Sequence, residues 1–432
     1  MASGKGRKKA LSAHDVFTPS SFPEHSYVAR RDADLEEQLR FALKTKGQIV
    51  SLSGPSKSGK TVLVEKVVGK EHLVPVVGAG IQAADQVWTR VLDWLDAPVE
   101  VQKGDASGLM TSARAGARVG GNVVVATGFA TGHLQTGVKK ESMTTTKEQR
   151  RGLETVIEAI GETEHVVLVD DFHYMPREVQ VEVAKQLKEA SRRDVRIVTA
   201  AVPHRADDVV RANPELRGRV ASVDVPYWKT ADLVRIAEAG FDALNVDFDK
   251  KSAESLAREA AGSPQLMQAL CLYACFVLGA TERFATRAEK ALLAADLVKV
   301  CKLTCTVCDF RSLVDVLDAG PRRGAERKTY KFDDESSGDV YRAVLKAIAS
   351  EPLALTFTYD AILDRVEKVC VGEVPPGSSI ALALAHIDKL ALDQVPTSRV
   401  LEWDEGKQVL DIPDPYFMFY LRWSGRLAQA DE

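Results

Sequence analysis

Eight consecutive residues, Gly54-Pro55-Ser56-Lys57-Ser58-Gly59-Lys60-Thr61, have the types and spacing of a phosphate-binding loop. They read G-x-x-x-x-G-K-[ST], the P-loop motif. The two glycines let the backbone curl so that successive N–H groups face one phosphate cluster. We expect Lys60 to reach the β- and γ-phosphates and Thr61 to ligate Mg²⁺. The pattern therefore predicts that the chain binds ATP with Mg²⁺.

A second set of chemical groups follows the apolar run Val166–Val169, where Asp170 and Asp171 stand side by side. Four apolar residues predict a buried parallel strand, and ligands of open α/β sheets bind at the carboxyl edge of such strands. We expect Asp170 to hold Mg²⁺ through water and Asp171 to orient or activate the attacking water. Both aspartates would also suit the cap of a following helix, which does not conflict with this chemistry.

The next apolar run, 195–202, carries Thr199. A polar side chain on the strand beside the Asp170 strand can sense the γ-phosphate, and we predict this role for Thr199. His204 and Arg205, just beyond the run, are alternatives.

Two arginines, Arg217 and Arg219, precede the short strand expected at 221–225. Either one suits an arginine finger aimed at the γ-phosphate of a neighbouring subunit, because the transition state needs a fixed cation where charge develops. The alternative is an ordinary surface arginine in a salt bridge. The sequence does not choose between the two residues.

The cysteines offer a possible metal site, because Cys301, Cys305 and Cys308 have the C-x-x-x-C-x-x-C spacing of an iron–sulfur site. They fall inside a continuous helical pattern, 294–317, and not on a loop. We therefore predict reduced thiols on a buried helix face and no metal. Cys271 and Cys275, four residues apart on another apolar helix, are interpreted in the same way.

The elements that must position the P-loop alternate between strands and helices. The loop lies between an apolar strand, 49–52, and a helix, 62–68, and a further strand and helix are expected at 72–77 and 82–95. This alternation predicts an α/β fold with a parallel sheet. We assign the ATPase core to residues 27–228. Its approach segment, 27–31, has the position at which many P-loop ATPases contact adenine.

Two stretches lack the periodic apolar residues that a packed core requires. Residues 1–26 are predicted to be a flexible basic tail, with Lys5, Arg7, Lys8 and Lys9 among glycine and serine. Residues 98–146 are glycine-rich and are interpreted as an insertion, either a β-hairpin or mobile arm or a disordered loop.

Helical patterns follow the core and predict a lid at residues 229–282. Its turn Gly262-Ser263-Pro264 would place Pro264 against the nucleotide base. A helical connector is expected at 283–336. Residues 337–432 show three helices and then a hairpin, the order of a winged helix.

The winged helix would ordinarily bind DNA. Here the third helix, 380–389, offers few base-reading or phosphate-binding side chains, and the wing carries Glu402, Asp404 and Glu405. These carboxylates would repel phosphates. We therefore predict a protein-contact or autoinhibitory module, with DNA binding as the less favoured alternative.

Bulk properties fit a protein without a membrane span. The 432 residues carry a formal net charge of −4 and are 45% hydrophobic. Apolar runs are too short to cross a bilayer, and the N-terminus lacks a signal-peptide core. We expect a cytoplasmic location.

Taken together, Gly54–Thr61, Val166–Asp171, Arg217/Arg219 and Gly262-Ser263-Pro264 resemble the AAA+/STAND superfamily of P-loop ATPases. The chain looks similar to the prokaryotic STAND-type and origin-binding-type branch, related to NACHT and NB-ARC switches. The resemblance implies an α/β P-loop (ASCE/AAA+) core, a helical lid and a C-terminal winged helix. The strand ends in Asp-Asp where fast AAA+ motors have Asp-Glu, which favours slow hydrolysis, and the lid turn lacks a clear second-sensor arginine.

The resemblance also implies function. It indicates an ATP-hydrolysing switch that forms homo-oligomers with nucleotide and controls a separate effector or sensor protein, with a role in antiphage or stress defence. The alternative is a DNA-bound AAA+ loader or transposition regulator. The expected nucleotide-binding residues are Gly54, Pro55, Ser56, Lys57, Ser58, Gly59, Lys60, Thr61, Val62 and Pro264; the expected catalytic residues are Lys60, Asp171, Thr199, Arg217 and Arg219; and the metal ligands are Thr61 and Asp170.

Overall fold

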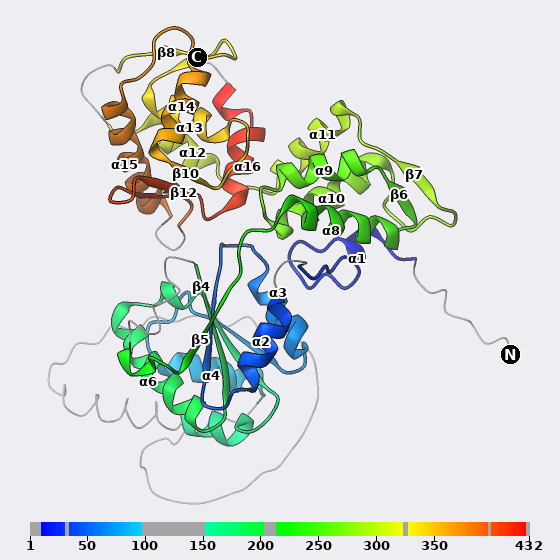
Figure 1. Ribbon diagram of the computed structural model, residues 1–432, viewed down its shortest axis with the longest axis vertical. Coiled ribbons are helices and arrows are strands. Elements are labelled where there is room, and N and C mark those ends of the chain that lie inside the picture. The colour runs from blue at the N-terminus through cyan, green and yellow to red at the C-terminus, as the bar shows by residue number, and fades with distance from the viewer. Residues whose placement is uncertain are drawn as a thin grey trace, which may run out of the picture.

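The computed structural model describes residues 10–30, 34–96, 152–202, 213–322, 327–395 and 399–428. Figure 1 shows three parts: a core below, a lid to the right, and a C-terminal domain above. The insertion predicted at 98–146, together with His204 and Arg205, lies outside the described residues.

The core is built on a five-stranded sheet in the order β2-β3-β4-β1-β5, in which every neighbouring pair is parallel. β1 and β3 are buried almost throughout, as expected of strands covered on both faces. β4 separates the P-loop strand β1 from the Asp170 strand β3. The strands span Ile49–Ser53 (β1), Leu73–Val77 (β2), Val166–Asp170 (β3), Arg196–Ala201 (β4) and Val220–Asp224 (β5).

Helices cover both faces of this sheet (Figure 1). On one face, α2 (Leu35–Lys44) and α3 (Lys60–Val68) bury Leu39 and Val64. On the other face, α4 (Asp85–Trp94) and α6 (Arg177–Arg192) form a second apolar cluster. Residues 152–160 are also helical, and short 3-10 turns lie at Phe172–Tyr174 and Pro214–Leu216. This strand order and layering confirm the predicted α/β fold with a parallel sheet.

The lid is helical, as predicted, with a two-stranded parallel sheet at its far edge. The predicted connector divides between two parts, because α11 packs on α10 of the lid whereas α12 packs on α13 and α15 of the C-terminal domain. The elements span Thr230–Ala243 (α8), Val246–Phe248 (β6), Lys250–Glu259 (α9), Pro264–Leu278 (α10), Ala288–Lys290 (β7), Ala294–Cys305 (α11) and Arg311–Ala319 (α12).

The prediction of a flexible tail over residues 1–26 is wrong for residues 10–26, the part that the structure describes. In this N-terminal segment, α1 (Ala13–Val16) begins with a capping box at Ser12 and lies against α10. Phe17 is fully buried, and its ring lies 5.3 Å from that of Phe241 in α8. The basic, serine-rich composition concealed this short apolar pair, whose burial depends on the distant lid.

The C-terminal domain has the element order of a winged helix, as the sequence predicts. A three-stranded antiparallel sheet, ordered β10-β12-β11, closes one side of its helices. The elements span Val340–Ala349 (α13), Thr356–Thr358 (β10), Tyr359–Val369 (α14), Gly377–Gln394 (α15), Glu402–Asp404 (β11), Val409–Asp411 (β12) and Pro415–Trp423 (α16); the small strands β8 (Tyr330–Lys331) and β9 (Ser337–Gly338) precede them.

The N-terminal segment, the lid and the C-terminal domain share one apolar cluster, which runs from Ala13 to Leu427. Buried polar contacts also join the lid to α16: Trp423 Nε1 donates to Glu259 Oε2 at 2.7 Å, and Arg422 Nε lies 3.2 Å from the same oxygen. In the described part of the chain, the two clusters of the core include only residues between Leu35 and Val225. The apolar clusters of the described residues therefore form two packed bodies.

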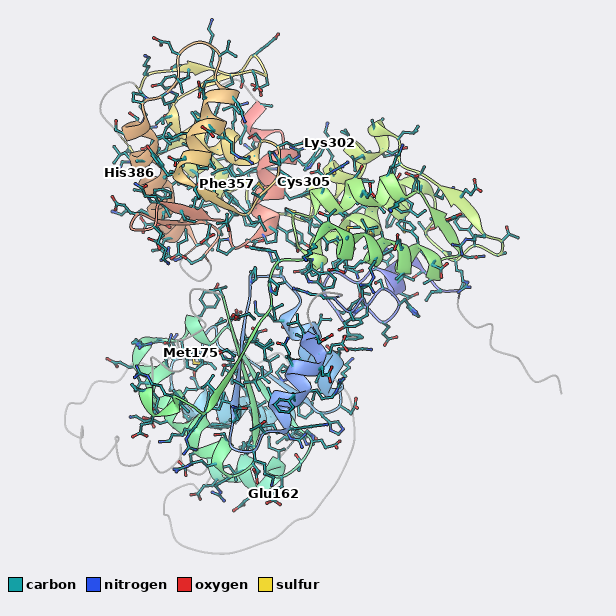
Figure 2. The ribbon with its side chains drawn as sticks, viewed as in Figure 1. Glu162, Met175, Lys302, Cys305, Phe357 and His386 are labelled. Carbon is teal, nitrogen blue, oxygen red and sulfur yellow. The ribbon has the colours of Figure 1, made fainter. Side chains whose placement is uncertain are left out.

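The thiols are buried, as predicted, but the predicted continuous helix over 294–317 is wrong, because α11 ends at Cys305 and Cys308 lies in the connection to α12. All six cysteines are buried and unbonded to one another, and Cys305 lies where α11 approaches α16 (Figure 2). Burial raises the pKa of Cys305 to about 11. The described residues contain no cluster of three or more potential metal ligands. They also contain no helix that meets the length and hydropathy needed to cross a bilayer.

Candidate nucleotide-binding site

The P-loop and the two aspartates lie at the carboxyl edge of the core sheet. Glu162, before β3, lies at the end of the core away from the other body, whereas Met175, after β3, lies near the end facing the C-terminal domain (Figure 2). The parallel register places Ser53, Ala201 and Asp224 at the same edge. This is where ligands of open α/β sheets bind.

The loop is held in a curl by its glycines. Gly59 has φ +88°, a left-handed conformation that favours glycine. Gly54 lies directly against the backbone of Val225, which leaves no room for a side chain. Gly59 caps α3, and the N–H groups of Gly59, Lys60 and Thr61 donate to no acceptor among the described residues. These donors are available to a phosphate.

Lys60 is folded into the loop. Its Nζ donates to the carbonyl oxygens of Gly54 and Pro55, at 2.8 Å each. Burial lowers the pKa of Lys60, while the charges of Asp170 and Asp171 oppose that shift. The cation is thus aimed inside the curl, with two carboxylates nearby.

Thr61 and Asp170 are in contact, as the prediction of a shared Mg²⁺ requires. Thr61 Oγ1 donates to Asp170 Oδ2 at 2.8 Å, although the two residues are 109 positions apart. Asp170 Oδ1 accepts from the backbone N–H of Asp171 at 3.0 Å. A hydroxyl and a carboxylate are the oxygen ligands that Mg²⁺ prefers. The chemistry of this pair fits the ion.

Asp171 occupies a strained turn behind Asp170. Its φ is +55°, which is uncommon outside glycine. Burial, and then the charge of Asp170, raise the pKa of Asp171 to about 6, while Lys60 opposes the shift. A carboxylate with a pKa near the working pH is suited to general-base chemistry.

One buried polar atom in the loop lacks a partner. Ser58 is 2% exposed, and its Oγ has no hydrogen-bond partner in the described part of the chain. Buried hydroxyls are ordinarily satisfied, so such an atom needs an explanation. A phosphate oxygen in the curl would supply an acceptor for it.

A cavity of about 960 Å³ adjoins the loop. The core contributes the P-loop from Ser56, Val62, Asp170 and Asp171; the N-terminal segment contributes Thr18–Pro23 and Ser26–Arg30; the lid contributes Trp228, Pro264 and Gln268; and the C-terminal domain contributes Leu392, Arg399 and Pro413. Such a volume suits a nucleotide-sized ligand. All predicted loop residues from Ser56 to Val62 line it, and so does Pro264.

Pro264 lies close to the loop. It is the first residue of α10, and a methyl group placed on Gly59 would lie 3.7 Å from Pro264 Cγ. Whether Pro264 contacts a nucleotide base, as the sequence predicts, stays a prediction.

Three residues for which the sequence predicted no contact with the P-loop bind its outer side. Arg30 Nη2 and Trp228 Nε1 both donate to the carbonyl oxygen of Ser58, at 3.1 and 3.0 Å. Lys57 Nζ contacts both carboxylate oxygens of Asp414, at 2.8 and 2.7 Å, and lies 4.4 Å from the ring centre of Tyr416. No local sequence pattern marks Trp228 or Asp414, because their partners are 170 and 357 positions away.

Thr199 is buried within the sheet. Its hydroxyl donates to the carbonyl oxygen of Val50 at 3.5 Å, and Thr199 does not line the cavity. β4 does lie beside β3, as the prediction assumed. The structure does not bring the Thr199 side chain to the phosphate-binding loop, and its sensor role stays untested.

Arg217 and Arg219 lie at the opposite edge of the sheet from the P-loop. The carbonyl oxygen of Arg219 accepts from the N–H of Ile49 at 2.9 Å, at the start of β1. Arg217 is exposed, and neither residue lines the cavity. They are therefore not part of this molecule's own site, and a finger role would require a second subunit.

Comparison with known proteins finds structural likeness only. No family model and no curated protein sequence matches the chain. A Walker-type ATPase of Pyrococcus abyssi is 15% identical over 91% of this chain and 96% of its own, with a TM-score of 0.48. Cdc6p of Pyrobaculum aerophilum is 12% identical over 97% and 98%, with a TM-score of 0.44, and the ORC2 protein of Aeropyrum pernix, in ADPNP–ADP complexes, is 11% identical over 95% and 97%, with a TM-score of 0.48.

Proposed function

We propose that the protein is an ATP-binding and ATP-hydrolysing molecular switch. The observation that carries the proposal is the contact of Thr61 with Asp170 at 2.8 Å, beside a lysine buried in a glycine-lined curl. The groups needed to bind a triphosphate, to hold a divalent cation and to activate water all lie at the carboxyl edge of the sheet.

Each residue has a distinct part in the proposed reaction. The free N–H groups of the curl and Lys60 bind the phosphates, and Thr61 and Asp170 hold Mg²⁺, which supplies positive charge to the β- and γ-phosphates when bound. Asp171, when ionised, orients the attacking water and accepts its proton. The lid and the N-terminal segment wall the cavity and limit the access of other water.

Phosphate release and nucleotide binding test the proposal together. We expect Lys60→Ala to lose ATP binding and Asp171→Asn to retain ATP binding but lose phosphate release by at least a hundredfold, in the range of general-base effects (roughly 10²–10⁴). If Asp171→Asn releases phosphate as fast as the wild-type protein, the catalytic assignment is wrong. If Lys60→Ala still binds ATP, this cavity is not the nucleotide site.

The proposed switch assembles with copies of itself. Arg217 and Arg219 lie away from the molecule's own cavity, so they would act only on a neighbour's γ-phosphate. We expect particle mass to rise with ATP in the wild-type protein, and to rise less in Arg217→Ala or Arg219→Ala. If particle mass does not change with nucleotide or with either substitution, the hypothesis that Arg217 or Arg219 is an arginine finger is wrong. A role in defence or a separate effector is implied by resemblance alone.

A second candidate function is a DNA-bound AAA+ loader or regulator, which the observed winged-helix element order favours. Against it, the exposed positions of α15 include Lys389 and Asp393, whose charges cancel, and Leu392 faces the nucleotide cavity. DNA titration at several salt concentrations separates the two functions. Tight binding with a steep salt dependence would favour the DNA-bound function.

A further inference from the structure

Two side chains from outside the core grip one peptide group of the P-loop. Arg30 belongs to the N-terminal segment, and Trp228 lies at the entrance to the lid. Both donate to the carbonyl oxygen of Ser58, at 3.1 and 3.0 Å, so they occupy both of its lone pairs. We call Arg30 and Trp228 the Ser58 clamp.

The clamp is itself held in place. Arg30 Cζ lies 4.7 Å from the ring centre of Trp228, and Arg30 Nη1 donates to the carbonyl oxygen of Pro226 at 2.5 Å. Arg235 of α8 donates to the carbonyl oxygen of Ala29 at 2.7 Å. Arg30 and Trp228 are half-buried, and both line the nucleotide cavity. Because Arg30 is already stacked on Trp228 and hydrogen-bonded, its side chain loses little further conformational freedom by donating to the Ser58 carbonyl oxygen.

The planar geometry of the peptide bond means that holding the Ser58 carbonyl also orients the Gly59 N–H. The Ser58 carbonyl and the Gly59 N–H belong to one planar trans peptide, so they point in opposite directions. Donors that fix the carbonyl on the outer side of the loop therefore turn the Gly59 N–H to the inner side. That N–H has no acceptor in the described part of the chain, and Gly59 has the φ of +88° that this orientation needs.

We propose that Arg30 and Trp228 are positioning residues of the nucleotide site, which pre-orient the Gly59 N–H toward the phosphates of a bound nucleoside di- or triphosphate. This inference rests on the proposed function. Without the clamp, the nucleotide itself must order the peptide, and affinity falls by the cost of that ordering. Because the N–H contacts phosphate in the ground state and the transition state alike, its loss acts on binding and not on the chemical step.

The clamp also links the site to the second body of the molecule. Arg30 is the last described residue of the N-terminal segment before the core, and Trp228 follows Val225, the last residue of the core's apolar clusters. One member of the clamp therefore lies next to the core on each side of it in the sequence. The orientation of the Gly59 N–H therefore depends on how the lid is seated.

The test uses the full chain with two conservative variants. Trp228→Phe keeps an aromatic ring under Arg30 but removes the indole N–H, and Arg30→Lys keeps the charge but removes the fork of donors. We expect each to weaken ADP binding about fivefold, the effect of one ordinary hydrogen bond. The KM for ATP should rise by a similar factor while kcat stays within about twofold. Because both act on one carbonyl, the double variant should lose less than the product of the two effects.

Matched controls repeat the same chemical changes elsewhere. Trp94→Phe alters a tryptophan of α4 that does not line the cavity, and Arg287→Lys alters an exposed arginine of the lid body. Both should bind ADP as the wild-type protein does. Thermal melting without nucleotide verifies that each variant is folded; if Trp228→Phe does not fold, Arg30→Lys carries the test.

Two results would overturn the clamp: ADP affinity equal to wild type in both variants, or a fall in kcat with unchanged KM. Lys60→Ala separates this failure from failure of the proposed function. If Lys60→Ala abolishes ADP binding while the clamp variants bind normally, only the clamp is wrong. If Lys60→Ala binds ADP normally, the proposed nucleotide site is wrong as well.

Discussion

Lys57 of the P-loop and Asp414 of the C-terminal domain form an ion pair with Nζ–O distances of 2.8 and 2.7 Å, across 357 positions of the sequence. The Lys57 and Asp414 side chains are 29% and 13% exposed, and Tyr416 covers the ammonium group. Asp414 also caps α16 by accepting from the N–H of Tyr416. The phosphate-binding loop thus contacts the far end of the chain directly.

Asp414→Asn should loosen the contact between the core and the C-terminal domain. Asparagine caps a helix as well as aspartate does, so α16 stays intact while the charge is lost. We expect docking to weaken by about 1 kcal/mol, the scale of a partly exposed ion pair. The radius of gyration from small-angle scattering should increase, and amide exchange in the P-loop should accelerate.

Glu405→Gln is the matched control, because it removes one negative charge from an exposed position of the wing. It should leave scattering and exchange unchanged. Equal scattering and exchange in Asp414→Asn and the wild-type protein would show that the ion pair does not hold the two bodies together.

Phosphate release should depend on the ionisation of Asp171. Burial and Asp170 raise the pKa of this carboxyl to about 6, and only the ionised form accepts a proton from water. We expect kcat to fall about tenfold per pH unit below pH 6 and to level off above pH 7. A profile of kcat between pH 5 and 8, at saturating ATP, measures this. A flat profile would exclude Asp171 as the base.

The same titration predicts the sign of a stability effect. The folded state binds the Asp171 proton more tightly than the unfolded chain, whose pKa is near 3.8, so stability falls as pH rises from about 4 to 6. Asp171→Asn removes this penalty. Without nucleotide, the variant should melt above the wild-type protein at pH 7.5, and the difference should vanish near pH 4.

Gly78→Ala should disturb the turn that carries both aspartates. Gly78 N–H donates to the carbonyl oxygen of Asp170 at 2.7 Å, and an added Cβ would lie 2.5 Å from the carbonyl oxygen of Asp171. The backbone must shift, at a cost of about 1–3 kcal/mol in stability. We expect kcat to fall roughly tenfold, since small displacements of catalytic groups are costly.

Gly406→Ala, in the wing, adds the same methyl group where only the flexible Asp404 side chain is near. It should leave kcat unchanged. If Gly78→Ala hydrolyses ATP at the wild-type rate, the close approach of Gly78 to Asp171 does not set the geometry of the turn.

Glu259→Gln should weaken the second body. Glu259 is 7% exposed, and it accepts from Trp423 and pairs with Arg422. The substitution removes the negative charge that faces Arg422, which keeps its contact with the exposed Glu351, so we expect a cost of roughly 1.5–3 kcal/mol, the scale of a hydrogen bond to a charged group. Urea unfolding should show this loss. Glu238→Gln, an exposed position on α8, should show none.

The sequence predicted those features that local pattern encodes. The P-loop needs a strand, a glycine curl and a helix in one short stretch, and the Asp170 strand is a plain apolar run. The order of elements in the winged helix was also predicted, because each of its helices and strands has its own local pattern. Contacts that depend on the seating of one body on the other were not predicted: the Ser58 carbonyl with Arg30 and Trp228, Lys57 with Asp414, and Phe17 with Phe241. Trp228 and Asp414 lie 170 and 357 positions from their partners, and Phe17 and Phe241 lie on opposite sides of the core in the sequence. Arg30 is only 28 positions from Ser58 but belongs to the other body, so no periodicity links any of these pairs.

The shared apolar cluster that joins residue 13 to residue 427 has a mechanical consequence. If α1, the lid and the C-terminal domain turned together against the core, a rotation of a few degrees would displace the residues farthest from the core the most. In Figure 1 that far end is the part of the C-terminal domain around β8, whereas the three-stranded sheet lies at the end that faces the core and would move least.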